Sequence, residues 1–138
     1  MDTFLPPNQH LAIRTIAMPR DTNPKGDVFG GWLVSQMDLA AGTIASIRAK
    51  GRTVTIAIDA LIFHKPVFIG DEVSCYVEII RIGRTSITLK VEAWVRRALS
   101  NDTLKVTEGT FTFVAIDTEG RPRPVPKSET IYQNKPFG

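Results

Sequence analysis

One long helix in a chain that otherwise reads as strands is the feature that most restricts the fold. Between Gly30 and about Ala49, apolar residues recur at spacings of three and four, which is typical of a helix with one buried stripe. The stripe consists of Leu33, Met37, Ala40, Ile44 and Ile47. Gly51 follows as a stop signal, so a helix of about 20 residues is predicted here.

The remaining patterned segments are strand-like. β-Branched residues or polar–apolar alternation mark residues 10–17, 53–63, 73–82, 86–96 and 104–116. Residues 86–96 alternate most clearly, which predicts a half-exposed strand. Because one helix can cover only one face of an antiparallel sheet of this size, the sequence predicts an α+β domain whose sheet wraps the helix.

The predicted helix is apolar around more than half of its circumference. The composition as a whole, with 43% hydrophobic and 22% charged residues, is ordinary for a globular protein. A sheet on one side would leave part of this helix surface uncovered. We therefore expect a partner subunit to bury it, which predicts a homo-oligomer.

Length and charge narrow the class of protein. A chain of 138 residues can build one domain with a real core, which we expect to span residues 8–126. Residues 127–138 are expected to form a flexible tail, and the proline-rich stretch from Asp117 onward to be extended or loose. The net charge of +3, without a basic stripe, argues against a nucleic-acid partner.

Cysteine use and the N-terminus bear on localisation. Cys75 is the only cysteine and lies in an apolar run, so a buried thiol is expected rather than a nucleophile. The first residues have no basic and apolar signal regions, and no apolar stretch reaches the ~18 residues of a membrane span. These observations predict a cytoplasmic protein with no membrane partner.

The segment from Asn23 to Asp38 carries the main functional signal. A polar turn runs into the glycine pair Gly30 and Gly31, which opens the predicted helix. Such a helix start presents backbone N–H groups to an incoming oxygen. A lone carboxylate, Asp38, lies on the helix at the edge of its apolar arc. Together these features predict an active site.

Each of these residues also has a structural interpretation. Asn23 precedes a proline and could serve the turn alone, and Asp27 has helix capping or helix-dipole stabilisation as its default role. Gly30 and Gly31 could permit close packing, and Asp38 could be a solvated carboxylate. If Asp38 is partly buried, desolvation would raise its pKa, as suits a general base.

Other kinds of site are not supported by the sequence. His10 and His64 have no partners at metal-ligand spacing, so no metal site is predicted. None of the serines, including Ser86, lies in a nucleophile-elbow motif. The chemistry would have to use a carboxylate, an amide and backbone N–H groups.

Residues 23–38 contain the signature Asn…Gly-Asp-Val-Phe-Gly-Gly…Met-Asp. With this signature, which is the most specific part of the similarity, the chain resembles the bacterial YciA-type acyl-CoA thioesterases of the hot-dog superfamily. The similarity covers roughly residues 10–126 and includes segments 18–19, 63–67, 70–71, 91–95, 106–108 and 111–115.

The resemblance implies a hot-dog fold, in which a curved antiparallel sheet of five to six strands wraps a long helix. It implies dimers joined sheet edge to sheet edge, three of which form a hexamer. It also implies acyl-CoA hydrolysis at a site between subunits, where Asn23 of one chain faces Asp38 of the other. Related enzymes often have histidine just before the paired glycines, but here that residue is Phe29. The thiolate would therefore leave without a histidine acid.

The resemblance implies a mechanism in which the N–H of Gly30 or Gly31 polarises the thioester carbonyl and Asn23 holds the water or the carbonyl. Asp38 activates a water or attacks directly to give an anhydride; the sequence does not choose. Lys65, Arg81 and Arg84 are candidates for the phosphates of coenzyme A. The full set of candidate substrate-binding residues is Asp27, Phe29, Val54, Thr55, Ile56, Ala57, Ile58, Lys65, Arg81, Arg84 and Ser86.

No cofactor is implied beyond the coenzyme A of the substrate. Two alternative functions stay open. One is a non-catalytic acyl-CoA-binding module, in which Asn23 and Asp38 would be idle. The other is a hot-dog hydratase or dehydratase, which would normally use a histidine near the helix start.

Overall fold

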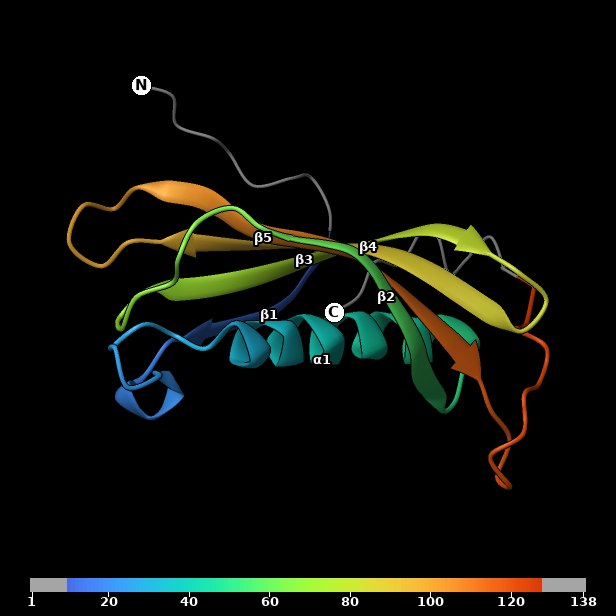
Figure 1. The fold of residues 1–138 in the computed structure, drawn as a ribbon. Coiled ribbons are helices and arrows are strands. Elements are labelled where there is room, and N and C mark those ends of the chain that lie inside the picture. Colours follow the sequence, from blue (N-terminus) through green and yellow to red (C-terminus); the bar gives the residue numbers. More distant parts are fainter. Residues whose placement is uncertain (1–9, 128–138) are drawn as a thin grey trace.

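The computed structural model describes residues 10–127 and has one long helix packed against one sheet (Figure 1). Its elements in chain order are β1 (His10–Ile16), a 3-10 turn (Pro19–Asp21), α1 (Gly30–Ala49), β2 (Thr53–Phe63), β3 (Glu72–Ile82), β4 (Ser86–Arg96) and β5 (Thr103–Ala115). The strands form one antiparallel sheet in the order β1-β3-β4-β5-β2. The predicted α+β class, the helix and its strands are confirmed. Most of the tail predicted for residues 127–138 lies outside the described residues.

The core lies between α1 and the concave face of the sheet. Leu33, Met37 and Ile44 of the helix are buried against sheet residues such as Leu89 and Phe111. One predicted stripe residue is wrong, because Ile47 is 38% exposed and Arg48 is buried in its place. A helix has 3.6 residues per turn, so the next core-facing position after Ile44 falls between residues 47 and 48. Packing rather than side-chain polarity decided which of the two residues is buried.

Two further interior predictions have different outcomes. Cys75 is fully buried as expected, and burial raises the pKa of its thiol to about 12. β4 was expected to expose its polar face, but Thr88, Glu92 and Trp94 on that face are buried. The indole of Trp94 donates a hydrogen bond to Glu92 at 2.9 Å. The alternation therefore predicted the strand but not its burial.

The end of α1 is held by the segment that follows β5. Lys50, not Gly51, takes the left-handed conformation, with φ of 56°. Gly51 instead leaves room for Arg123, since a Cβ there would lie 2.5 Å from the guanidinium. Arg123 donates through Nη2 to the carbonyl of Ala49 at 2.9 Å, which satisfies one of the free carbonyls at the helix end.

The stretch after Asp117 was predicted to be extended or loose; residues 117–127 have no helix or regular strand, but they are not loose. Arg48 donates through Nη1 to the carbonyl of Pro126 at 2.6 Å. The backbone N–H of Val125 donates to the carbonyl of Arg84 at 2.8 Å, and the backbone N–H of Arg123 donates to the carbonyl of Ala115 at 2.9 Å. These long-range bonds fasten the proline-rich segment across the helix end, which its composition could not reveal.

Two irregularities bend β2 around the helix. Its pairing with β5 shifts register between Thr55 and Ala57, and again between Asp59 and Ile62. Within the second bulge Ala60 has a left-handed backbone, with φ of 51°. β2 is also an edge strand, so one side of its backbone has no sheet partner in the described chain.

Replacing Ala60 with glycine is expected to stabilise the protein by about 0.5–1 kcal/mol. Glycine removes the ~1–2 kcal/mol cost of alanine in a left-handed conformation. Part of this gain is offset because glycine loses more backbone entropy on folding than alanine does. Urea unfolding at a fixed protein concentration measures the change. The matched variant Ala57→Gly, at the other irregularity of β2 but without a positive φ, should instead lose about 0.5–1 kcal/mol. An Ala60→Gly protein no more stable than the parent would contradict strain at this bulge.

Candidate functional site

The start of α1 leaves backbone donors free. The first intrahelical bond runs from the N–H of Leu33 to the carbonyl of Phe29 at 3.3 Å. The N–H groups of Gly30 and Gly31 therefore have no partner in the described part of the chain. A Cβ on Gly31 would meet nothing within 4 Å, whereas one on Gly30 would lie 3.4 Å from the ring of Phe63. The packing interpretation thus applies to Gly30, and Gly31 faces open space.

Asn23 serves the turn, as its structural interpretation predicted. Its Oδ1 accepts hydrogen bonds from the backbone N–H groups of Lys25 at 2.9 Å and Asp27 at 3.1 Å. These two donors require the oxygen at that position and so determine the orientation of the amide. The Nδ2 group makes no hydrogen bond within residues 10–127 and is available as a donor to another oxygen.

Asp27 does not cap the helix, so the capping interpretation is wrong, and helix-dipole stabilisation stays a prediction. The N-cap residue is Phe29, and no side chain bonds to the first turn of α1. The loop is instead attached through its backbone. The N–H of Phe29 donates to the backbone carbonyl of Asp21 at 3.0 Å, and the N–H of Val28 donates to the backbone carbonyl of Val67 at 3.2 Å. The carboxylate of Asp27 is exposed and remains free to meet a ligand.

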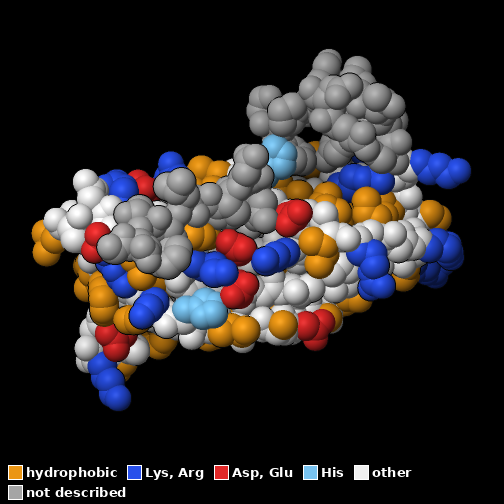
Figure 2. Space-filling model, turned by 90° about the horizontal axis from the view of Figure 1, so that it is seen from above, with side chains coloured by type: hydrophobic (Ala, Val, Ile, Leu, Met, Phe, Trp, Pro, Cys, Tyr) orange, Lys and Arg blue, Asp and Glu red, His pale blue; other side chains and the backbone are white. Residues whose placement is uncertain are grey.

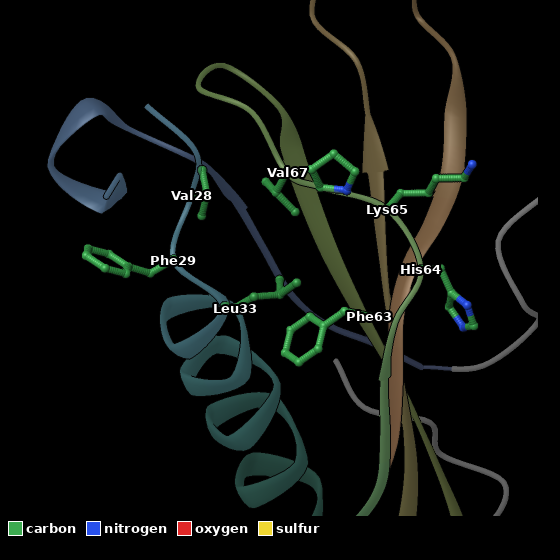
Figure 3. Close-up of a pocket in the computed structure, with 9 residues that line it drawn as sticks. Val28, Phe29, Leu33, Phe63, His64, Lys65 and Val67 are labelled. Carbon is green, nitrogen blue, oxygen red and sulfur yellow. The ribbon is translucent and has the colours of Figure 1, made fainter. Parts of the chain in front are cut away.

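A pocket of about 340 Å³ opens between the helix start and the segment after β2. Figure 3 shows Leu33 and Phe63 extending toward each other across it, with Val28 and Val67 at its upper end. The ring of Phe29 extends to the other side of the helix start. The pocket is therefore apolar inside, with the free N–H groups of the helix start at its edge.

His64 and Lys65 border this pocket, but their side chains point away from the helix (Figure 3). The imidazole Nε2 of His64 lies 2.7 Å from Oε2 of Glu108, and Lys105 lies 3.3 Å from the same oxygen. The hydrogen bond with His64 is the main cause of the lowered pKa of Glu108. The imidazole is thus held on the outer face of the sheet, away from the helix start.

Asp38 lies at mid-helix, half-buried and facing β2. The hydroxyl of Thr55 donates to its Oδ1 at 2.6 Å. The sequence placed Thr55 among substrate-binding residues and missed this contact, which spans 17 residues and depends on the curvature of β2. Asp38 follows Gly30 by eight residues, a distance along the helix axis of about 12 Å. Within one chain, therefore, the carboxylate is well separated from the free N–H groups.

The other candidate substrate-binding residues fall into two groups. The first lies on the open edge strand β2, where Val54, Ile56 and Ile58 are exposed and Ala57 is half-buried. The second lies at the β3–β4 hairpin, where Arg81 and Arg84 are exposed. There Ser86 accepts a backbone hydrogen bond from Gly83 at 2.8 Å.

Lys65 lies at the opposite end of the sheet from Arg81 and Arg84 (Figure 1). The backbone N–H of Lys65 bonds to Val106, which the sheet register places level with Ser74 of β3. Arg81 follows Ser74 by seven residues, roughly 23 Å along the strand. A single protomer therefore does not bring these three cations together around one ligand.

Within residues 10–127, no three side chains of metal-binding type come together. No helix in this range is long and apolar enough to cross a membrane.

Comparisons with known proteins identify the family of this chain. Residues 25–98 match the family described as the Thioesterase superfamily. The acyl-CoA thioester hydrolase YciA of Salmonella typhimurium is 45% identical over 123 residues, covering 87% of this chain and 92% of its own.

Two solved structures are also similar. The hexameric thioesterase from Yersinia pestis has a TM-score of 0.85 and 48% identity, covering 88% of this chain and 99% of its own. A hexameric broad specificity acyl-coenzyme A thioesterase has a TM-score of 0.87 and 42% identity, covering 94% of this chain and 90% of its own.

Proposed function

This chain belongs to the thioesterase superfamily and is an acyl-CoA thioester hydrolase of the hot-dog fold, and we propose that each of its active sites is shared by two protomers. Asp38 comes from one protomer, and Asn23, Gly30 and Gly31 come from its partner. The observation that carries the proposal is the distance of about 12 Å along one helix between the carboxylate and the free N–H groups.

The open edge of β2 supports a two-fold dimer. An unpaired strand with exposed Val54, Ile56 and Ile58 is a surface that folded proteins normally cover. A two-fold axis across this edge makes the two β2 strands antiparallel, and the two helices with them. The start of one helix then faces the body of the other. The protein is a homo-oligomer, and two similar solved structures are hexameric. We propose that three such dimers of this chain form a hexamer.

The chemistry follows from the free groups. The thioester carbonyl accepts from the N–H of Gly31, and from that of Gly30 where Phe63 leaves room, and these donors stabilise the developing oxyanion. The Nδ2 group of Asn23 donates to the attacking water or to the carbonyl. The oxygen of the water bonds to the carbonyl carbon while the Asp38 carboxylate takes a proton from that water. The tetrahedral intermediate then releases coenzyme A as a thiolate.

No histidine acid is needed for this last step. A thiol has a pKa of about 8.5, so the thiolate is a good leaving group near neutral pH. Direct attack by Asp38, with an anhydride intermediate, is the second route. In the anhydride route a single turnover in ¹⁸O-water puts the label into Asp38 when water attacks the aspartyl carbonyl. No cofactor is required beyond the coenzyme A of the substrate.

The direct test is the release of free thiol from a panel of acyl-CoAs of different chain length. We expect catalytic release that saturates with acyl-CoA concentration. Cys75 is fully buried, so the protein itself adds little to a thiol-reagent signal. Saturable binding without release would identify a non-catalytic acyl-CoA-binding module. Water addition to an enoyl-CoA without thiol release would identify a hydratase.

Thr55→Val is expected to lower kcat about tenfold. Loss of the 2.6 Å hydrogen bond frees the Asp38 carboxylate to leave its catalytic orientation. The matched control is Thr53→Val on the same face of β2, where the hydroxyl bonds to Ser46 at 2.9 Å and does not contact Asp38. Steady-state kinetics of both variants test the contact. Equal kcat values for the two would contradict a positioning role for Thr55.

A further inference from the structure

The pocket at the helix start lies directly beside the free backbone donors. Gly30 is one of its lining residues, so the N–H groups of Gly30 and Gly31 lie at its rim. The acyl chain of a thioester is bonded directly to the carbonyl carbon. A carbonyl that accepts from these N–H groups therefore places the first carbon atoms of the chain at the mouth of this pocket, whose interior is apolar.

Two other hollows in the described residues lie away from these donors. One, of about 340 Å³, lies around Phe68 and Arg97. The other, of about 210 Å³, lies on the outer face of the sheet around Ile80 and Lys90. Neither is lined by a residue of the helix start, and both include charged side chains. Neither therefore offers an apolar chain a place next to the carbonyl.

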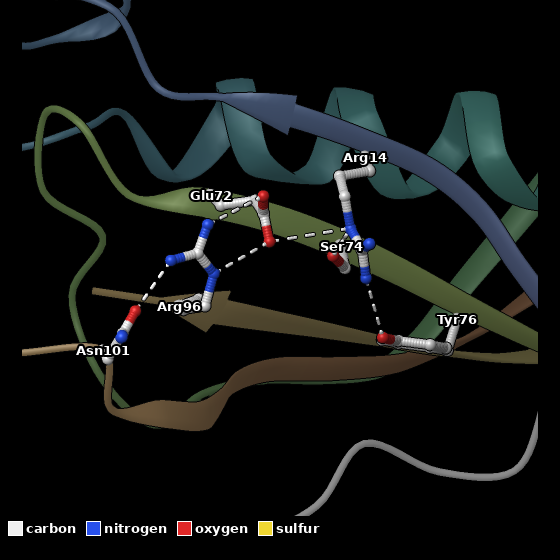
Figure 4. A network of polar contacts seen from close by, with 6 residues as sticks. All are labelled: Arg14, Glu72, Ser74, Tyr76, Arg96 and Asn101. Atoms are coloured by element: carbon white, nitrogen blue, oxygen red, sulfur yellow. Dashed lines mark hydrogen bonds and ion pairs between the residues drawn. The ribbon is translucent and has the colours of Figure 1, made fainter. Parts of the chain in front are cut away.

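The outer face of the sheet, which is turned away from α1, is polar. Figure 2 looks onto this face and shows acidic and basic side chains side by side over its middle. Lys105 lies 3.3 Å from Glu108 there. Toward β1, Glu72 is held between Arg14 and Arg96, at 3.7 and 3.2 Å (Figure 4). An acyl chain on this face would cover charged groups, which costs free energy.

Most walls of the pocket at the helix start are fixed by the core. Leu33 is 2% exposed and Val67 is 4% exposed, and both belong to the hydrophobic core. Val28 packs against this core, and its backbone N–H donates to the carbonyl of Val67 at 3.2 Å. Phe63 differs, because 51% of it is exposed although its side chain is large and apolar. The ring of Phe63 is therefore the wall that can change in size without a loss of core packing.

The end of β2 directs the ring of Phe63 at the pocket. Its neighbour Ile62 pairs with Glu108 on the outer face of the sheet. Successive strand residues point to opposite faces, so Phe63 faces the helix. The next residue, His64, anchors the strand end through its hydrogen bond with Glu108 at 2.7 Å.

Phe63 also lies at the correct place on β2 for the shared site. A two-fold axis across the open edge of β2 places the end of one strand beside the start of the other. Phe63 is the last residue of β2, and Thr55, which bonds to Asp38, is near its start. Phe63 of one protomer therefore borders the same site as Asp38 of the partner subunit.

We propose that this pocket holds the acyl chain of the substrate and that Phe63 limits the length of chain that the enzyme accepts. The ring extends across the pocket toward Leu33 (Figure 3) and lies 3.4 Å from the position of a Cβ on Gly30. A chain that runs from the helix start between α1 and β2 meets this ring, and a longer chain has to displace it. The preferred substrates are therefore straight acyl chains of short to medium length. The proposal rests on the proposed function and adds its substrate class.

Thiol release from a series of straight-chain acyl-CoAs, each below its critical micelle concentration, tests the proposal. We expect kcat/KM of the parent to rise with chain length to a maximum and then to fall. In Phe63→Ala the maximum should move to chains about two to four carbons longer, since loss of the ring leaves a cavity. For those chains kcat/KM should increase about tenfold, the effect of roughly two more methylene groups leaving water. Phe63→Trp should move the maximum to shorter chains.

The matched control is Ile62→Ala, at the neighbouring residue, which is 49% exposed and faces the opposite side of β2. It should keep the chain-length profile of the parent. Affinities for S-alkyl-CoA thioethers, which cannot be hydrolysed, measure the same length dependence without the chemistry. Circular dichroism and light scattering verify the fold and the assembly of every variant.

Two results would overturn the role of Phe63. One is a maximum at the same chain length in the parent and in both Phe63 variants, and the other is an equal shift in Ile62→Ala. Thiol release by a parent whose thioether profile is unchanged in the Phe63 variants would refute the pocket alone. A shifted thioether profile in a protein that releases no thiol would support the pocket and refute the proposed hydrolysis.

Discussion

Asp38→Asn is expected to lower kcat for acyl-CoA hydrolysis about 10³-fold with little change in the fold. Asparagine has the same shape, and its Oδ1 can still accept the hydrogen bond that Thr55 donates to Asp38 at 2.6 Å. It cannot take a proton from water and cannot form an anhydride. Both routes of the proposed mechanism therefore fail in this variant, while the pocket at the helix start stays unchanged.

Free-thiol release under saturating acyl-CoA measures this loss. The matched control is Asp59→Asn, which removes an exposed carboxylate from β2, the strand that carries Thr55. This control should leave kcat within about twofold. Circular dichroism and light scattering verify that both variants keep the fold and the assembly of the parent. An Asp38→Asn protein that hydrolyses acyl-CoA at the parent rate would refute the role of this carboxylate.

The second large effect is a recovery of activity in mixed oligomers. Asn23→Ala is expected to lose about 10²-fold in kcat, because it removes a donor that acts on the reacting oxygens. When Asp38→Asn and Asn23→Ala chains are co-expressed, half of the random dimers contain one of each. In a shared site, each such dimer has one site with both native residues. The mixture should therefore reach about a quarter of the parent activity.

A site within one chain gives a different result, because no mixed dimer would then contain an intact site. The activity would stay near the average of the two single variants. Differently tagged chains allow the mixed oligomers to be purified. A control that combines the two separately purified variants just before the assay should show no recovery unless subunits exchange. Absence of recovery in verified mixed oligomers would contradict the shared site.

Most of the fold could be predicted because it depends on local patterns. The 3.6-residue spacing of apolar side chains marks α1, and β-branched runs mark the strands. The errors occur where neighbours in space decided. Ile47 and Arg48 are equally close to the core-facing position by spacing. Residues 117–127 are held by the bonds from Arg48 to Pro126 and from Arg123 to Ala49, and each bond joins positions more than 70 residues apart in sequence (78 and 74 residues).

The candidate site was predictable in its parts and less so in its arrangement. The turn of Asn23, the free N–H groups after Phe29 and the carboxylate of Asp38 all follow from short-range sequence. The contact from Thr55 to Asp38 does not, because the bulge after Thr55 determines which side chains of β2 face the helix. Likewise, the basic side chains alone do not reveal that Lys65 follows β2 at one end of the sheet while Arg84 follows β3 at the other.

The sequence by itself determined the helix, the strands, the buried thiol of Cys75 and the groups available for chemistry. Their physical cause is local: residue spacing, turn residues, and backbone donors that a helix start leaves free. Only the tertiary structure decided which groups meet. It separated Asp38 from Gly31 along one helix and left the edge of β2 open. These arrangements depend on sheet register and chain crossing, which join residues that no local pattern relates.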